Sequence, residues 1–206
     1  MELGNDMRSR FIEWCAKLGA EHWLSNNLWL ELKSCYGEAH RKYHTLEHIA
    51  ASLTELDTLS ASSSAVEGAI WFHDVIYDPR CSDNEDASIA WFRQATQKWM
   101  DPSLVKDISS LITVTDFRRS ASSDPFHQIM VDIDLAIFSA EESIYDDYAR
   151  AIRSEYSHVD EDSYRKGRGE VMELFLSRPI YRTSQFQHRE ARARMNISRE
   201  LRNLRV

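Results

Sequence analysis

Helical signals follow one another along the whole chain, whereas signals for β-strands are nearly absent. The 206 residues include only six glycines, and neither Asn-Gly nor Asp-Gly, the dipeptides that favour tight hairpin turns, occurs. Between residues 45 and 58, apolar side chains recur at i, i+3, i+4, i+7 and i+10, the spacing of one face of an amphipathic helix. The sequence therefore predicts an all-α fold, a single helical bundle with a C-terminal helical extension.

Several helix starts carry recognisable capping residues. Ser64, Ser82 and Ser139 each precede a glutamate by three residues, which is the form of a capping box. Asp101 and Asp124 each precede a proline, which suits an N-cap followed by the first helical position. Helices are predicted near residues 8–19, 22–36, 45–58, 65–76, 84–100, 102–115, 126–138, 141–157, 162–177 and 184–204.

The length of the chain and its charge distribution indicate one domain with a basic end. A chain of 206 residues can bury a substantial core, so residues 1–206 are predicted to form a single domain. Residues 165–206 carry 11 basic and 4 acidic side chains, which leaves 14 basic and 29 acidic ones for residues 1–164. We expect the basic terminal helices to dock on the acidic remainder rather than on nucleic acid, with a homodimer interface as the alternative.

The cysteines and the hydropathy pattern point to a reduced compartment away from the membrane. Cys15, Cys35 and Cys81 are an odd number without Cys-x-x-Cys spacing, which argues against both a disulfide framework and a zinc ribbon. No run of residues approaches the roughly 18 apolar positions that a membrane span needs, and residues 1–10 lack the apolar core of a signal peptide. We therefore expect a cytoplasmic protein without a membrane partner.

The adjacent pair His73-Asp74 lies within the apolar run of residues 69–77. Burying an imidazole beside a carboxylate is costly unless the two serve a purpose, and both side chains bind divalent metals. Four residues separate His44 from His48, so on one helix both would face the same side. These residues predict a metal site lined by helices.

The segment from His44 to His48 also fits the H-x-x-E-H pattern of inverted zinc peptidases. In that chemistry the two histidines bind zinc and Glu47 activates water. Five residues make a short motif, however, such peptidases are much larger, and this interpretation leaves His73 and Asp74 without a role. The inverted zinc peptidase is therefore a minor alternative.

A fuller interpretation joins His48, His73 and Asp74 with an acid from residues 132–134, so that three helices contribute to one site in the bundle core. The order of these motifs resembles the HD-domain superfamily, and in particular a bacterial subgroup of predicted metal-dependent HD phosphohydrolases. The resemblance covers residues 41–201 or so and implies a metal-site core of about residues 41–140 followed by C-terminal helices of about residues 141–206. The motifs that carry it are Arg41-x-Tyr43-His44-x-x-x-His48, Trp71-Phe72-His73-Asp74, Asn84-Glu85-x-x-Ser88, Asp132-x-Asp134-Leu135, Arg153-x-Glu155-Tyr156 and the region from Glu190 to Asn196.

Carried over position by position, the resemblance makes His48, His73 and Asp74 metal ligands. The fourth ligand is Asp134, with Asp132 as the alternate. Two residues apart on a helix, the two point about 200° from each other, so one of them should face the core, and Asp134 is favoured because it matches the second acid of the Asp-x-Asp runs in several HD relatives. The implied activity is hydrolysis of a phosphate ester or anhydride in a small phosphorylated substrate, with a nucleotide as the favoured kind.

Further residues complete the predicted site. Asp78 and Glu85 are the acids predicted to assist a water, although Glu85 also fits the capping box that Ser82 begins. His44 is predicted to bind phosphate or to support a neighbouring carboxylate.

Three more side chains are predicted to bind substrate, namely Arg41, Arg153 and His127. Arg41 ranks first because of its closeness to His44, and planar guanidinium groups suit phosphate. Relatives with two metals carry a histidine where this chain has Asp116, so a binuclear centre is doubtful. His127 is a loosely held candidate to replace that histidine. The acidic body favours a small nucleotide over a polyanion, because its field repels the latter.

The cofactor is predicted to be a divalent metal ion, with Mn, Co, Fe, Ni, Zn and Mg as the candidates and the number of ions left open. Two histidines favour Mn, Co, Fe, Ni or Zn over Mg, which prefers oxygen ligands. Such an ion would lower the pKa of its water and polarise a phosphoryl oxygen. Two alternatives of other classes are an HD-type diiron oxygenase and a metal-stapled, non-catalytic binding or regulatory module.

Overall fold

The computed structural model describes residues 2–59 and 63–205 and confirms the all-α prediction, since no strand occurs within those ranges. No helix in the described ranges combines the length and apolar character that crossing a bilayer requires. The elements are α1 (Glu2–Lys17), α2 (His22–Tyr36), α3 (Leu46–Asp57), α4 (Ser64–Phe72), α5 (Asn84–Thr96), α6 (Pro102–Thr113), α7 (Pro125–Asp134), the 3-10 helix η1 (Leu135–Ser139), α8 (Glu142–Glu155), α9 (Glu161–Leu176), the 3-10 helix η2 (Gln187–Arg189) and α10 (Glu190–Leu204).

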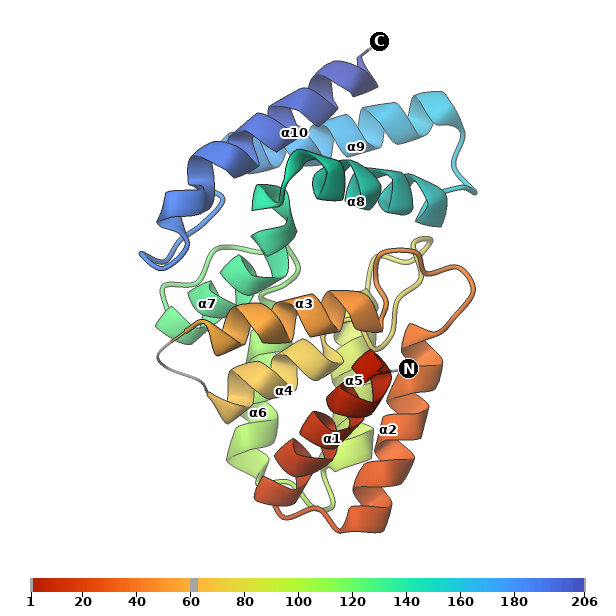
Figure 1. Ribbon diagram of the computed structural model, residues 1–206, viewed down its shortest axis with the longest axis vertical. Helices are drawn as coiled ribbons and strands as arrows, with labels where there is room; N and C mark the ends of the chain where they lie inside the picture. Colours follow the sequence, from red (N-terminus) through yellow and green to blue (C-terminus); the bar gives the residue numbers. More distant parts are fainter. Residues whose placement is uncertain (1, 60–62, 206) are drawn as a thin grey trace. The chain divides into compact units, whose positions relative to one another are not determined.

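The chain divides into two compact units, which we call unit 1, residues 1–121, and unit 2, residues 122–206. Unit 1 contains α1 to α6, drawn from red to light green in Figure 1, and unit 2 contains α7 to α10, drawn from green to blue. Whether the two units form one domain stays a prediction, and the predicted metal-site core of residues 41–140 takes residues from both.

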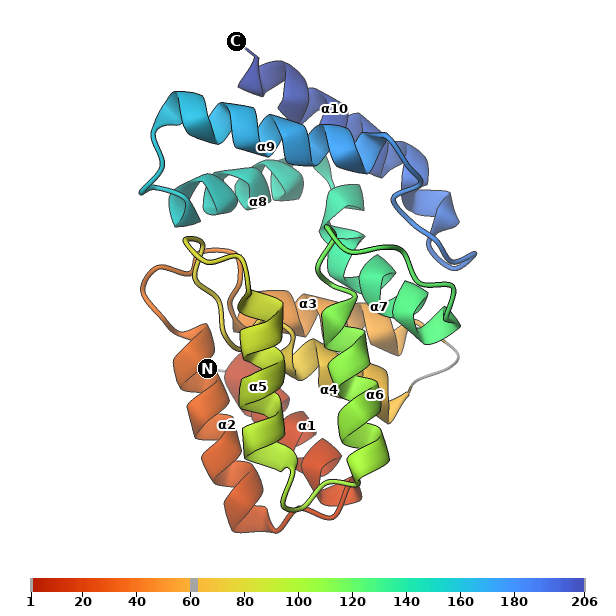
Figure 2. The ribbon, with the colours of Figure 1, turned by 180° about the vertical axis from the view of Figure 1, so that it is seen from behind.

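The core of unit 1 is built around α4, whose apolar residues are buried on all sides. The rings of Phe11 and Trp71 lie edge to face with centroids 5.2 Å apart, and Phe72 lies 5.0 Å from Phe92. Edge-to-face aromatic pairs add to the stabilisation that burial of their area provides. Most of α4 is buried: α3, α5 and α6 pack against it, as Figure 2 shows from behind, and α1 contributes the ring of Phe11.

Gly68 sets the close approach between α4 and α6. A Cβ atom on Gly68 would lie 2.6 Å from Cδ1 of Ile108 and 2.8 Å from a ring carbon of Trp14. Real Cβ atoms do not approach that closely, so only a residue without a side chain permits this packing.

Unit 2 encloses a buried polar network among α8, α9 and α10. Arg168 donates to Glu200 across 2.7 Å and to the Tyr148 hydroxyl across 3.0 Å, and the Tyr145 hydroxyl donates to Glu200. Asn196 donates to the carbonyls of residues 138 and 140, each across 2.9 Å, which ties α10 to the end of η1. A buried charge is tolerated when its donors and acceptors are all engaged, as they are in this network.

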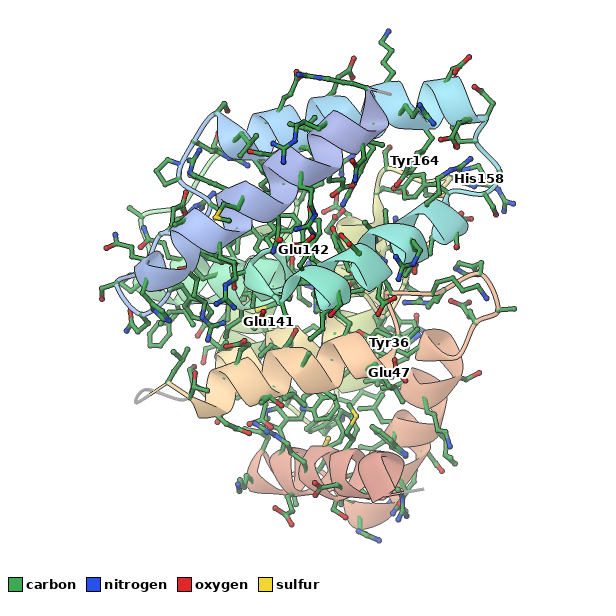
Figure 3. The ribbon with its side chains drawn as sticks, turned by 45° about the horizontal axis from the view of Figure 1, so that its top comes forward. Tyr36, Glu47, Glu141, Glu142, His158 and Tyr164 are labelled. Carbon is green, nitrogen blue, oxygen red and sulfur yellow. The ribbon has the colours of Figure 1, made fainter. Side chains whose placement is uncertain are left out.

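The basic terminal helix pairs with acidic residues as the charge pattern predicts. Arg199 of α10 lies 2.7 Å from Asp146 and 3.2 Å from Glu142 of α8, and Arg192 pairs with Glu141. Figure 3 labels Glu141 and Glu142 at the start of α8. Exposed pairs of this kind contribute at most about 1 kcal/mol each to stability, so they affect the orientation of α10 more than the stability of the fold.

The predicted helix starts are right at the two aspartates and wrong at the three serines. Asp101 and Asp124 accept backbone N–H groups from the first turns of α6 and α7. The residues before α4, α5 and α8 are instead Ser63, Asp83 and Glu141. The Ser82 carbonyl accepts a hydrogen bond from Arg118, and the Ser139 hydroxyl donates to the carbonyl of residue 136. The spacing of residues along the chain does not reveal either contact.

Two glycine substitutions test the packing argument. Replacing Gly68 with alanine should lower the free energy of unfolding by about 1–3 kcal/mol, because the new methyl group overpacks the contact between α4 and α6. The matched change Gly167→Ala in α9, where a Cβ meets nothing within 4 Å, should raise it by about 0.4–1 kcal/mol. Denaturant unfolding of both variants measures the difference, and an unaltered midpoint for Gly68→Ala would refute the close approach.

Candidate metal centre

His48 lies in the first turn of α3 and is only 6% exposed. The side chain of Thr45 begins that helix by accepting the N–H of Glu47 across 3.2 Å. His44 therefore precedes α3, and the prediction that His44 and His48 share one face of a helix is wrong. The threonine cap decides this, because a residue at the N-cap has extended rather than helical backbone angles.

His73 and Asp74 directly follow α4, which ends at Phe72 and not near residue 76 as predicted. Side chains from elsewhere in unit 1 take the carbonyl groups that a longer helix would use. The buried hydroxyl of Tyr36 donates to the carbonyl of Trp71 across 3.0 Å, and Arg41 donates to the carbonyls of Asp74 and Val75 across 2.6 and 3.0 Å. These bonds stop the helix and turn His73 and Asp74 toward His48.

The His73 ring presents a lone pair to the site. Its Nδ1 lies 3.1 Å from the carbonyl oxygen of Ile70. A carbonyl only accepts, so Nδ1 carries the proton and Nε2 of the neutral ring is left with its lone pair. A backbone carbonyl on the far nitrogen is the usual support of a metal-binding histidine.

The three side chains converge on one point. Nε2 of His73 lies 3.1 Å from Nε2 of His48 and 3.1 Å from Oδ2 of Asp74, and the remaining pair of atoms is 3.7 Å apart. The centre of this triangle lies about 2 Å from each atom, which matches the bonds of roughly 2.0–2.2 Å that imidazole nitrogen and carboxylate oxygen form with zinc. His48, His73 and Asp74 form a group that could hold a metal ion.

The electrostatics of the group suit a cation. Burial by itself would raise the pKa of Asp74, but the positive charge that His73, His44 and His48 can carry outweighs it and holds this pKa far below its usual range. Asp74 therefore stays ionised at every ordinary pH and is available as an anionic ligand.

The Arg41 guanidinium is buried and used within the fold. Besides the carbonyls of Asp74 and Val75, it donates to the carbonyl of His44 across 3.2 Å and to Glu38 across 2.9 Å. It thereby joins the segment that precedes α3 to the segment that follows α4. The prediction that Arg41 binds substrate phosphate loses its basis, because these bonds occupy four of its N–H groups.

His44 lies beside the site without joining the group of three. Its ring stacks on Tyr77 with centroids 4.0 Å apart, and it lies close enough to influence the ionisation of Asp74. This position agrees with the supporting role predicted for His44.

The predicted acids Asp78 and Glu85 are in different surroundings. The carboxylate of Asp78 accepts the N–H of Arg80 across 2.9 Å, which forms a turn. Burial raises the pKa of Glu85, and the charges of Asp116 and Asp74 add to the effect, whereas Arg118, 3.5 Å away, opposes it. Glu85 is thus the acid that is suited to proton transfer.

Asp116, where the family resemblance led us to expect a second-metal histidine, is a buried carboxylate held by arginines. It is 6% exposed and pairs with Arg118 and Arg119 across 2.7 and 3.1 Å. Two cations neutralise its charge, and the expectation that a binuclear centre is doubtful stays a prediction.

The other predicted site residues belong to unit 2. Both oxygens of Asp132 accept backbone N–H groups of Arg182 and Thr183, so this buried carboxylate fastens a loop. Asp134, at the end of α7, therefore stays the predicted fourth ligand.

The remaining two, His127 and Arg153, make contacts within unit 2. His127 lies 2.8 Å from the Ser122 hydroxyl through Nδ1. Arg153 donates to the carbonyls of residues 156 and 159 and lies 4.5 Å from the ring of Tyr164, labelled in Figure 3. Arg153 thus closes the turn between α8 and α9, and its role in substrate binding stays a prediction.

The predictions missed three residues that hold the ligand-bearing segment. Besides Tyr36, these are Asn84, which bonds the N–H and the carbonyl of Asp78, and Ser88, which bonds those of Ile76. Asn84 and Ser88 belong to a motif that the sequence displays, whereas nothing in the sequence near Tyr36 points to its bond with Trp71.

Metal binding tests the group directly. Replacing His73 with alanine should weaken binding of Mn²⁺, Co²⁺ or Zn²⁺ by more than about 100-fold, because the loss of mere supporting groups already costs about 10–100-fold. His22, exposed at the start of α2, provides the matched control His22→Ala, which should bind as before. Isothermal titration calorimetry measures both, and equal affinities in the two variants would rule out this centre.

Comparisons of the chain with protein-family models, curated proteins and solved structures found no match.

Proposed function

We propose that the protein is a metal-dependent phosphohydrolase that acts on a small phosphorylated substrate, with a nucleotide as the favoured kind. The convergence of His48, His73 and Asp74, with ligand atoms 3.1–3.7 Å apart, is the observation that carries the proposal. Two neutral nitrogens and one carboxylate leave a bound divalent ion with a net positive charge, which suits an anionic substrate.

The chemistry of the donor atoms narrows the choice of metal ion. A set of two imidazoles and one carboxylate favours Mn, Co, Fe, Ni or Zn over Mg, which prefers oxygen ligands in octahedral arrangement. When bound, a divalent ion supplies Lewis acidity, which activates water and offsets the charge that develops on a phosphoryl group.

Glu85 provides the proton transfer in this proposal. Its charge and that of Asp74 influence each other, so the two carboxyl groups lie within electrostatic reach. A raised pKa makes the Glu85 carboxylate a stronger base than a solvated glutamate, so it takes a proton from the attacking water more readily. Arg118 holds the Glu85 side chain in place while opposing the shift.

The inverted zinc peptidase has lost support. Its two histidines should face one side of a helix, but His44 precedes α3, and the exposed Glu47, labelled in Figure 3, lies in the first turn of that helix. The diiron oxygenase and the metal-stapled module have no observation that favours them over hydrolysis.

Removal of the metal tests the proposal. Purified protein should hydrolyse nucleotides or generic phosphodiesters with added Mn²⁺ or Co²⁺, and chelation or His73→Ala should abolish turnover while His22→Ala preserves it. The melting temperature of His73→Ala should fall only modestly. Full activity after chelation would refute hydrolysis at this centre, and unfolding of His73→Ala would instead identify the ion as a structural staple.

The pH dependence tests the role of Glu85. Below its pKa the carboxyl group is protonated and cannot accept a proton, so kcat/KM should fall as pH falls, with a midpoint above the usual glutamate value near 4.3. Glu85→Gln should lower kcat by roughly 10²–10⁴-fold and remove this acidic limb without weakening metal binding. Asp86→Asn is the matched control, because Asp86 is exposed and pairs with Arg119. An acidic limb that persists in Glu85→Gln would assign it to another group.

A further inference from the structure

The turn that follows α6 is organised by one buried carboxylate, that of Asp116. Its Oδ1 accepts the backbone N–H of Arg118 across 3.0 Å and the Nε–H of the same residue across 2.7 Å. Its Oδ2 accepts the Nε–H of Arg119 across 3.1 Å, and the backbone N–H of Arg119 donates to the carbonyl of Asp116 across 3.0 Å. We call Asp116, Arg118 and Arg119 the arginine turn.

Both guanidinium groups of the arginine turn reach the first turn of α5, which runs beside α6 in Figure 2. Nη2 of Arg118 donates to the carbonyl of Ser82 across 2.8 Å and lies 3.5 Å from the carboxylate of Glu85. Nη2 of Arg119 donates to the carboxylate of Asp86 across 2.9 Å. Two neighbouring cations bound to one carboxylate therefore face two neighbouring acids, one each.

The same turn of α5 is fixed against the segment that follows the candidate metal centre. The side chain of Asn84 bonds the N–H and the carbonyl of Asp78 across 3.0 and 2.9 Å. The hydroxyl of Ser88 bonds the N–H and the carbonyl of Ile76 across 3.1 Å each. Glu85 lies between these two anchors, about one helical turn before Ser88, so four hydrogen bonds set its place along that segment.

Arg118 is shared unequally between two carboxylates. At 2.7 Å its contact with Asp116 is a close, charge-assisted hydrogen bond. Its 3.5 Å separation from Glu85 exceeds the range of about 2.7–3.2 Å in which N–H groups form good hydrogen bonds to oxygen. A guanidinium drawn closer to Glu85 would neutralise that carboxylate and make it a weaker base.

The charge of Asp116 is secured by its two arginines. Burial raises the pKa of Asp116, but the hydrogen bonds from Arg118 and Arg119 outweigh this effect and leave the pKa below its usual value. In contrast, burial raises the pKa of Glu85, and the negative charge of Asp116 adds to the effect. Asp116 therefore keeps its charge, and its bond to Arg118, in the range of pH in which Glu85 takes up a proton.

Charged groups from three segments lie near the Glu85 carboxylate. They follow α6, follow α4 or occupy the next position of α5, and they are Asp116 and Arg118, Asp74, and Asp86. Asp86 is paired with Arg119, and Asp74 stays ionised at every ordinary pH. The position of Arg118 is thus the variable that decides how strongly Glu85 is neutralised.

We propose that Asp116 is a positioning residue for Glu85: by binding Arg118 it holds this guanidinium away from the Glu85 carboxylate, which stays available to accept a proton. Arg118 lies near enough to steady the side chain of Glu85, so one cation serves two carboxylates at unequal distances. That Glu85 accepts the proton of an attacking water rests on the proposed function, whereas the division of Arg118 between the two acids does not.

Removing either member of the close pair should change Glu85 in opposite directions. In Asp116→Asn a negative charge is lost and the neutral amide binds Arg118 less strongly, so the pKa of Glu85 should fall. In Arg118→Gln a positive charge is lost, so this pKa should rise. The matched control is Arg119→Gln, which should leave the pKa of Glu85 nearly unchanged, because Arg119 binds the same carboxylate but pairs with Asp86.

A double variant separates positioning from a simple effect of charge. With Arg118→Gln already present no guanidinium remains to move, so adding Asp116→Asn should lower the pKa of Glu85 by less than half of the fall seen in Asp116→Asn alone. The pKa is measured by ¹³C NMR of the Glu85 carboxyl carbon in the full chain, freed of metal by chelation and dialysis. The signal is assigned by its absence from Glu85→Gln.

Three outcomes would overturn the proposal. They are shifts of the same sign in Asp116→Asn and Arg118→Gln, equal shifts in Arg118→Gln and Arg119→Gln, and an undiminished effect of Asp116→Asn in the double variant. Circular dichroism and calorimetric binding of Zn²⁺ at unchanged affinity establish that each variant keeps its fold and its candidate metal centre. Should Asp116→Asn not fold, the two arginine variants still decide, because both replace exposed side chains.

Kinetics connect the positioning role with catalysis. If turnover is found, the acidic limb of kcat/KM should move to lower pH in Asp116→Asn and to higher pH in Arg118→Gln, because the limb follows the pKa of Glu85. If no turnover is found, the NMR shifts still decide the role of Asp116. A failure of the proposed function and a failure of the positioning role are therefore distinguishable.

Discussion

One buried guanidinium, that of Arg41, connects the two segments of unit 1 that carry His48, His73 and Asp74, the group that could hold a metal ion. It donates to the carbonyl of His44, just before the helix of His48, and to the carbonyls of Asp74 and Val75. A buried cation is stable only when its donors are engaged, so these carbonyls must stay where they are. The distances among His48, His73 and Asp74 follow from that requirement.

Carboxylates have opposite roles in the two units, and their partners explain the difference. Asp74 is surrounded by imidazoles, which keep it ionised with an oxygen directed at two ring nitrogens. Asp132 and Glu190 accept backbone N–H groups, and these hydrogen bonds hold a loop in place. A carboxylate that faces amides supports the fold, whereas one that faces imidazoles can hold a metal.

Much of the fold and the core of the site could be predicted from local patterns. The predicted ranges overlap all ten α-helices of the described residues, and Asp101 and Asp124 marked two helix starts correctly, because an N-cap accepts amides two or three residues away. His73 and Asp74 were identifiable because a histidine and an acid inside an apolar run are costly without a partner, whereas His48 was identified through the family resemblance. The serine caps failed because the three helices begin after Ser63, Asp83 and Glu141 instead.

The sequence by itself indicated where the helices lie, since helix formation depends on neighbours along the chain, and its motifs indicated His48, His73 and Asp74 as candidate metal ligands. Only the tertiary structure decided that α4 stops at Phe72, that Arg41 binds carbonyls and that Asp132 holds a loop 50 residues away. Each of these outcomes depends on a hydrogen bond between residues at least 33 positions apart. Hydrogen bonds between residues this far apart form only after the helices have packed, so the spacing of residues along the chain does not reveal them.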